Sequence, residues 1–134
     1  MIRDVQNIYS DAQAVTAVGN TDSTNTIDQL AAGDTYVQQF VRIRVNTAFT
    51  SGGAGTLAVN LVTDDDSGFG AATTIPLVGA TAVASLTANK VLFQGRLPIG
   101  IKRYRKLVYV VGTAAMTAGK IDAEEVIDIP TNRM

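Results

Sequence analysis

Three consecutive aspartates, Asp64, Asp65 and Asp66, are the side chains of this sequence best suited to hold a metal ion. Carboxylate oxygens are the ligands that Ca²⁺ prefers, and Ser67 and Gly68 continue the same turn-forming stretch. Their spacing does not match the calcium-binding loop of EF-hand proteins. Adjacent acids in a turn between strands commonly serve only to solvate it, so we expect no metal and no other cofactor.

Two adjacent glutamates, Glu124 and Glu125, raise the question of acid-base catalysis, because paired carboxylates hydrolyse glycosidic bonds. Neighbouring residues of a strand point to opposite faces of a sheet, so the two carboxyl groups cannot flank one bond. Residues 51–55 (SGGAG) lack the Lys-Ser/Thr end of a phosphate-binding loop and predict a turn. We therefore expect no catalytic residues.

The densest basic cluster is Lys102, Arg103, Tyr104, Arg105 and Lys106. It could bind nucleic acid, contact an acidic protein surface, or simply be solvated. A chain of net charge −1 exerts no long-range attraction on nucleic acid or anionic lipid, so neither is expected as a partner. Because Tyr and Arg are enriched at the centres of protein interfaces, we expect Arg103, Tyr104 and Arg105 to contact a partner protein.

The sequence of 134 residues contains no Cys and no His. This excludes thiol nucleophiles, disulfides, Cys/His zinc sites and imidazole acid-base chemistry, and we expect a protein that is not an enzyme. No stretch approaches the ~20 apolar residues of a membrane-spanning helix. The length fits one domain over residues 1–134.

Alternating apolar residues predict strands. In residues 37–45, Val37, Val41, Ile43 and Val45 share one face and the arginines share the other. Further strands are expected at residues 13–18, 26–30, 56–63, 73–78, 91–97, 105–111 and 120–129.

The segment 73–78 contains Pro76, which indicates a sheet edge or a bulge. The nearly continuous apolar run 105–111 is expected to be central and covered on both faces. Glu125 falls on the inward side of the last strand and needs a bulge, a partner or an exposed strand end. About eight short strands predict an all-β, jelly-roll-like, two-sheet antiparallel sandwich.

Residues 1–12 have helix-like apolar spacing but are too short to form a stable helix alone. We expect a short N-terminal arm that docks on its own domain or on a neighbour, with Ile8 and Tyr9 as contact residues.

Almost the whole chain resembles the cement, or decoration, proteins of tailed-phage capsids, the Bordetella-phage type in particular. The matching stretches are YSDAQAVTA (residues 9–17), STNTID (23–28), GAGTLAVNLVTDDDSGF (53–69) and FQGRLPIGIKRYRKLVYVVGTAAMTAGKIDAEEV (93–126). The resemblance implies a jelly roll that sits on the capsid exterior of the virion after synthesis in the host cytoplasm. It further implies a protein that bridges capsomers of the major capsid protein and forms a dimer or trimer with itself.

Two other functions remain open at this stage. A receptor- or carbohydrate-binding module of a phage tail would also be a β-sandwich, although such modules usually present aromatic platforms and this chain has no Trp and only 4 Tyr. A head-completion or tail subunit is the other alternative, and copy number per particle would separate it from a decoration protein.

Overall fold

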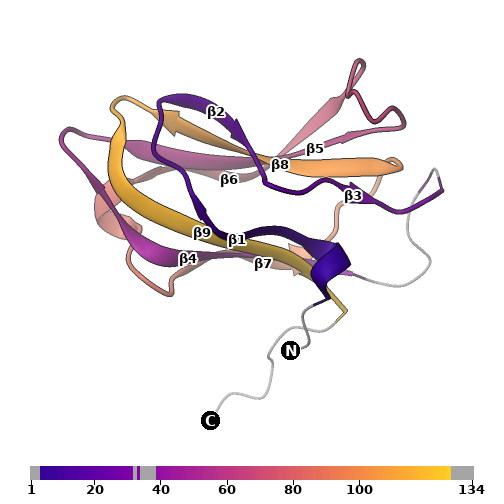
Figure 1. Ribbon diagram of the computed structural model, residues 1–134, viewed down its shortest axis with the longest axis horizontal. Coiled ribbons are helices and arrows are strands. Elements are labelled where there is room, and N and C mark those ends of the chain that lie inside the picture. The colour runs from indigo at the N-terminus through magenta and orange to yellow at the C-terminus, as the bar shows by residue number, and fades with distance from the viewer. Residues whose placement is uncertain (1–3, 32, 34–38, 128–134) are drawn as a thin grey trace, which may run out of the picture.

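Two antiparallel sheets form the computed structural model, which describes residues 4–31, 33 and 39–127. The first sheet has the strand order β1-β9-β4-β7, and the second has the order β2-β8-β5-β6, with β3 also paired to β8. Figure 1 shows the two sheets as stacked layers. The elements of the described residues are η1 (Val5–Asn7), β1 (Ile8–Ala14), β2 (Gly19–Asp22), β3 (Ile27–Asp28), β4 (Phe40–Ser51), β5 (Thr56–Asp64), β6 (Thr73–Ala82), η2 (Val83–Ser85), β7 (Val91–Arg96), β8 (Tyr104–Gly112) and β9 (Met116–Val126).

Four antiparallel strand pairs are nested within one another along the chain. β5 pairs with β6, β4 with β7 around them, then β2 with β8, and finally β1 with β9. The nested ribbon wraps around the core so that β9 lies beside β4 and β8 lies beside β5. This is the strand order of a jelly roll, and it confirms the predicted fold class.

Strict alternation places β4 and β5 on either side of the core. Val41, Ile43 and Val45 in β4 are fully buried, as are the apolar residues of β5 that share its inner face. The strand predictions for residues 56–63 and 73–78 are confirmed, and β6 is an edge strand with register irregularities opposite it, as Pro76 indicated. Val37, part of the prediction for β4, lies outside the described residues.

The N-terminal third differs from its prediction. Residues 8–12 belong to β1, which pairs with β9, and they are not a separate arm. The predicted strand 13–18 ends at Ala14, and β2 follows at Gly19. β2 consists of Gly, Asn, Thr and Asp, so no apolar pattern marks it, and backbone pairing with β8 defines it instead.

Strand ends also depart from simple alternation. Alternation along the strand predicted at 91–97 would place Val91 toward the core with Phe93. Val91 is instead 40% exposed, because a register shift in the β4–β7 pair lies beside it and Leu92 packs on the core. Alternation along the strand predicted at 120–129 would likewise place Ile127 on the inner face with Ile121, but Ile127 is 70% exposed just beyond the end of β9. The predicted remainder of this strand, residues 128 and 129, lies outside the described residues.

Candidate functional site

Three of the five residues expected to contact a partner lie inside the fold. Ile8, Tyr9 and Arg105 are buried, with Tyr9 and Arg105 at most 1% exposed. Tyr9 enters the core because β1 is a strand of the first sheet, and Arg105 faces inward from β8 with Leu107 and Tyr109. These placements correct the expectation that the three residues contact another protein on the surface of the fold.

Arg105 forms a buried ion pair that joins the two sheets. Its Nε lies 2.6 Å from Oε1 and 3.0 Å from Oε2 of Glu125, the inward acid of β9. Its Nη1 donates to the side-chain oxygen of Gln29 at 2.6 Å. Glu125 therefore has the partner that its inward position required, and Glu124 faces the opposite side of β9, as predicted.

Burial and charge shift the titration of this cluster. Burial opposes the charged form of Arg105, but hydrogen bonding to Glu125 and the charge of that acid outweigh it and raise the pKa of Arg105. Burial, followed by the charge of Glu125, raises the pKa of the Tyr9 hydroxyl well above its ordinary value. The raised pKa keeps the Arg105 guanidinium charged where it joins the two sheets.

Arg103 and Tyr104 remain at the surface. The Arg103 guanidinium donates to both carboxylate oxygens of Asp28, at 2.8 and 3.1 Å, and lies 4.8 Å from the centre of the Tyr104 ring. The hydrogen bonds from Arg103 lower the pKa of the Asp28 carboxyl. This bidentate pair and the ring contact hold the Arg103 side chain in one orientation.

Large exposed apolar side chains gather at the same end of the sandwich. β1, β4 and β8 begin there, and β3, β7 and β9 end there (Figure 1). We call this end the Arg103 end. Its exposed apolar residues are Val5 (80%), Leu30 (78%), Ile99 (91%) and Ile127 (70%).

Hydrogen bonds hold Leu30 in its exposed position. Its φ is +69°, a conformation that costs a branched residue free energy and persists only when the surroundings enforce it. Asp28 Oδ1 accepts from the Leu30 amide at 2.8 Å, and Gln29 donates through Nε2 to the carbonyl oxygens of Ala31 (2.7 Å) and Gly33. The same Gln29 accepts from Arg105, so the buried ion pair anchors the turn that displays Leu30.

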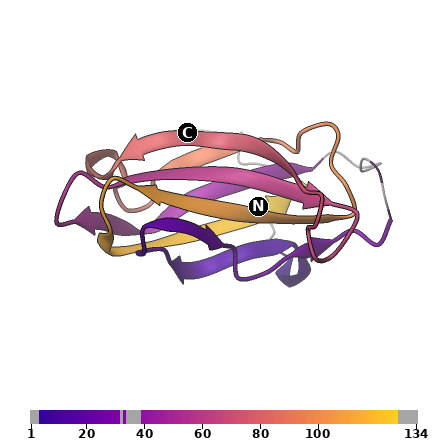
Figure 2. The same ribbon diagram turned by 90° about the horizontal axis from the view of Figure 1, so that it is seen from above.

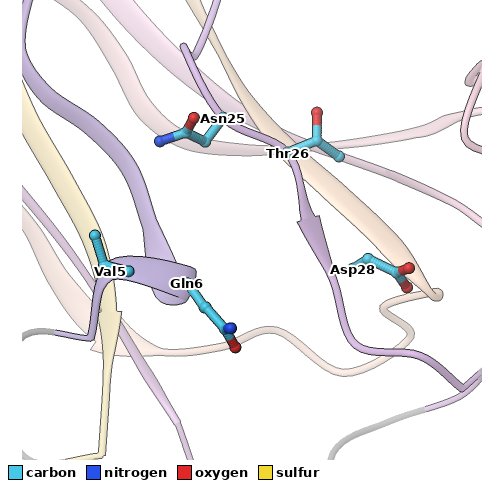
Figure 3. A pocket seen from close by; sticks show the side chains of 5 residues that line it. All are labelled: Val5, Gln6, Asn25, Thr26 and Asp28. Atoms are coloured by element: carbon cyan, nitrogen blue, oxygen red, sulfur yellow. The ribbon is translucent and has the colours of Figure 1, made fainter.

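A hollow of about 480 Å³ lies between η1 and β3 at this end. In Figure 3 its polar side chains do not converge on one point, since the Thr26 hydroxyl and the Gln6 amide point in different directions. Asp28 already binds Arg103. The hollow therefore lacks the convergent polar groups of a small-ligand site.

The acidic loop between β5 and β6 is organised by Asp64. Its Oδ1 accepts from the amide of Asp65 at 2.7 Å and its Oδ2 from the amide of Ala71 at 2.9 Å, and the Ala71 bond is the main cause of a lowered pKa. Among the described residues, no group of three His, Cys, Asp or Glu side chains is placed to hold a metal ion. Asp64 thus closes the loop by accepting backbone hydrogen bonds.

Reasoning from the sequence missed Leu30 and Ile99. Ile99 is a large apolar residue between Pro98 and Gly100. Leu30 was expected to end the strand at residues 26–30, but β3 already ends at Asp28. An apolar residue in a turn has no strand face through which to reach the core, and this signal could have identified Ile99, whereas no sequence signal marked Leu30 as exposed.

Within the described residues, no helix is long and apolar enough to cross a bilayer. A search of curated proteins gives no match to the chain. The model of the Bbp16 family matches residues 9–125, which span β1 to the last residues of β9. The chain therefore belongs to the Bbp16 family, a family of Bordetella phage proteins.

Proposed function

We propose that this protein is a structural component of the phage particle that binds the outside of the capsid and bridges neighbouring capsomers of the major capsid protein. It would act as a binding protein without enzymatic activity. The observation that carries the proposal is the Arg103 end, where an oriented Arg-Tyr pair stands among four exposed apolar residues. Membership of a phage protein family agrees with a role in the virion.

Binding energy alone accounts for capsid stabilisation. A protein that binds the assembled shell, and does not bind separate subunits, lowers the free energy of the shell by its own binding free energy. If one decorating unit holds two capsomers, their separation breaks two interfaces, so moderate contacts become effective. Apolar residues and an oriented arginine at one end suit such contacts.

Carbohydrate binding is less well supported by the aromatic residues. Two of the partly exposed rings near the Arg103 end are each covered by a cation: Arg103 lies over Tyr104, and Lys106 Nζ lies 4.6 Å from the centre of the Phe69 ring. Sugar recognition uses the open face of a ring, and these faces are occupied on one side.

Reconstitution on shells tests the proposal and the contact residues together. Capsids lacking the protein are mixed with wild-type chain or with the variants Arg103→Glu and Leu30→Asp, and occupancy is measured by electron cryomicroscopy. Loss of a central interface residue typically costs more than about 1.4 kcal/mol, so each variant should bind at least about tenfold more weakly.

Two matched controls carry the same chemical changes away from the Arg103 end. Lys90→Glu reverses a charge before β7, and Val18→Asp places an acid at a 60% exposed valine between β1 and β2. Both should decorate like the wild type. Equal occupancy for all four variants would remove the Arg103 end from the contact surface, and a location at the portal or tail in a few copies would overturn capsid decoration itself.

A further inference from the structure

Hydrogen bonds link the two sheets along one long side of the sandwich. The Asn25 amide donates to the Tyr9 carbonyl oxygen at 3.0 Å, and Gln13 Nε2 donates to the carbonyl oxygen of Asp22 at 2.8 Å. These bonds join β1 of the first sheet to β2 and to the residues before β3 in the second sheet. This side of the sandwich is therefore closed.

Along the opposite long side, part of the core is accessible from outside. There β6 and β7 are the outermost strands of their sheets in the described part of the chain, and Figure 2 shows the pink β6 across from the indigo β1 and β2. The described apolar residues that pack on the core while only partly buried all lie on these two strands or directly after them. We call them the β6–β7 seam, which consists of Ile75, Leu77, Val83, Leu92, Phe93 and Leu97.

The backbone of β7 carries hydrogen-bonding groups that point away from β4. The Leu97 amide donates to the Gln39 carbonyl oxygen at 2.9 Å, and the register continues from there to the pair of Val41 and Gly95. Residues in an antiparallel ladder alternate between pairs that exchange hydrogen bonds and pairs that do not. Gln94 therefore turns its N–H and C=O away from β4, toward the side on which β7 has no neighbouring strand among the described residues.

The edge of β6 is a poorer template for strand pairing than the edge of β7. Pro76 lacks an N–H, and the β5–β6 pair has register irregularities. Both features protect edge strands against pairing with another chain. β7 contains no proline, and its register with β4 is regular from Phe93 to Arg96.

The charges around β7 favour an acidic partner. Lys90 directly before the strand and Arg96 at its end are exposed, and residues 67–120 contain no Asp or Glu. A second copy of β7 in antiparallel pairing would bring Lys90 of one copy near Arg96 of the other, and like charges opposite one another are destabilising. A segment that carries carboxylates meets no such repulsion.

We propose that β7 pairs with an extended segment of another protein in which apolar residues alternate with acidic residues. The backbone of this segment would bond to Gln94, as in peptide recognition by strand addition. Successive side chains of a strand point to opposite faces, so the apolar residues would cover the β6–β7 seam. The acids would lie on the outer face of the first sheet, where register with Phe40 places Arg96. The seam shares no residue with the Arg103 end, so the proposal stands whether or not the chain decorates a capsid.

Peptide titration followed by nuclear magnetic resonance tests strand addition directly. The probe is a synthetic peptide of 6 residues, the length of β7, in which valine alternates with glutamate, and it is added to the isotope-labelled full chain. At saturation it should slow hydrogen exchange of the Gln94 amide at least about tenfold. The Gly95 amide, which faces β4, should change little.

Two altered peptides separate the charge from the backbone pairing. A peptide with lysine in place of glutamate keeps the ladder and reverses the charge. A peptide with methylated backbone amides keeps the side chains and cannot form the ladder. Each should bind at least about tenfold more weakly than the glutamate peptide.

Two variants of one residue test the same contact from the side of the protein. Gln94→Pro removes the outward N–H and should weaken binding of the glutamate peptide at least about tenfold. Gln94→Ala is the matched control, because both variants lose the hydrogen bond from Arg42 to the Gln94 side chain and only the proline lacks the backbone donor. It should bind the peptide like the wild type.

Circular dichroism checks that the variants fold, and the methylated peptide tests the ladder on the wild-type chain even if Gln94→Pro does not fold. The proposal would be overturned if the glutamate peptide did not bind, or if the methylated peptide bound equally well. Protection of the Gln94 amide that rises with chain concentration, without peptide, would assign the edge to a second copy and would also overturn it.

Discussion

Removal of one member of the buried Arg105–Glu125 pair should strongly destabilise the fold. Both side chains are at most 2% exposed, and the guanidinium bonds both carboxylate oxygens. Glu125→Leu leaves a buried guanidinium without its counter-charge, and Arg105→Met leaves a buried carboxylate. Losing one partner of such a pair costs about 3 to 5 kcal/mol.

This free energy converts into a measurable shift of the unfolding temperature. A chain of 134 residues has an unfolding entropy of about 0.28 kcal/mol/K at its midpoint, so each single variant should lose roughly 10 to 18 °C in Tm. The double variant Arg105→Met with Glu125→Leu removes both charges and fills the space with apolar atoms. It should unfold within about 2 kcal/mol of the wild type, or be more stable.

Thermal and urea unfolding of the four proteins, followed by circular dichroism, completes the double-mutant cycle. If either single variant lost less than about 1 kcal/mol, the pair would not be a desolvated tie between the sheets. If the double variant were as unstable as the sum of the singles, the cost would come from lost packing and not from unpaired charge.

Two further perturbations follow from the same structure. Gly119 has φ +145°, and a Cβ there would stand 2.2 Å from Cδ1 of the buried Phe49, so Gly119→Ala should lower the free energy of unfolding by about 2 to 5 kcal/mol, measured by chemical denaturation. In the control Gly52→Ala, the new Cβ would meet no atom within 4 Å, and the free energy of unfolding should change by no more than about 0.5 kcal/mol. Equal losses in the two variants would contradict the strain argument. The folded-state pKa of Asp28 and of Asp64 is lowered, so their contribution to stability is present above the unfolded pKa of about 3.9 and is lost as the pH falls below it. These two acids should therefore lower Tm only below about pH 4 when Tm is measured from pH 7 to pH 2. Asp64→Asn should make Tm fall less steeply with pH in this acid range. An unchanged dependence of Tm on pH would show that the Ala71 hydrogen bond does not hold the loop.

The sequence predicted the core strands well because each strand buries the residues of one face only. In β5, Leu57, Val59 and Leu61 alternate with smaller or polar residues, and a shift by one position would expose all three. The short polar strand β2 gave no comparable signal, since a backbone can pair with β8 whatever side chains it carries. β3 lies inside the strand predicted at residues 26–30 but has only two residues. Residues 1–12 were interpreted as an arm because their apolar spacing resembles that of a helix, whereas residues 8–12 pair with β9 as part of β1.

The candidate contact residues, like the strands, could be predicted from the sequence only in part. The basic run at residues 102–106 could be seen in the sequence, but strand alternation sends Arg105 inward and leaves Tyr104 and Lys106 outward. Whether the odd- or the even-numbered residues of β8 face the core depends on the register of β8 with β5. Packing across the whole sheet sets that register. Leu30 and Ile127 join Arg103 only because the strands bring distant parts of the chain to one end of the sandwich.

Composition and periodicity alone determined that this protein has no thiol or imidazole chemistry and that it forms a β-sandwich, because both properties depend on residue types and their local order. Tertiary structure decided that Arg105 meets Glu125 in the core and that four apolar residues share the Arg103 end. These depend on pairings between strands far apart in the chain, and free energy gained over the whole core selects such pairings. No local pattern encodes them.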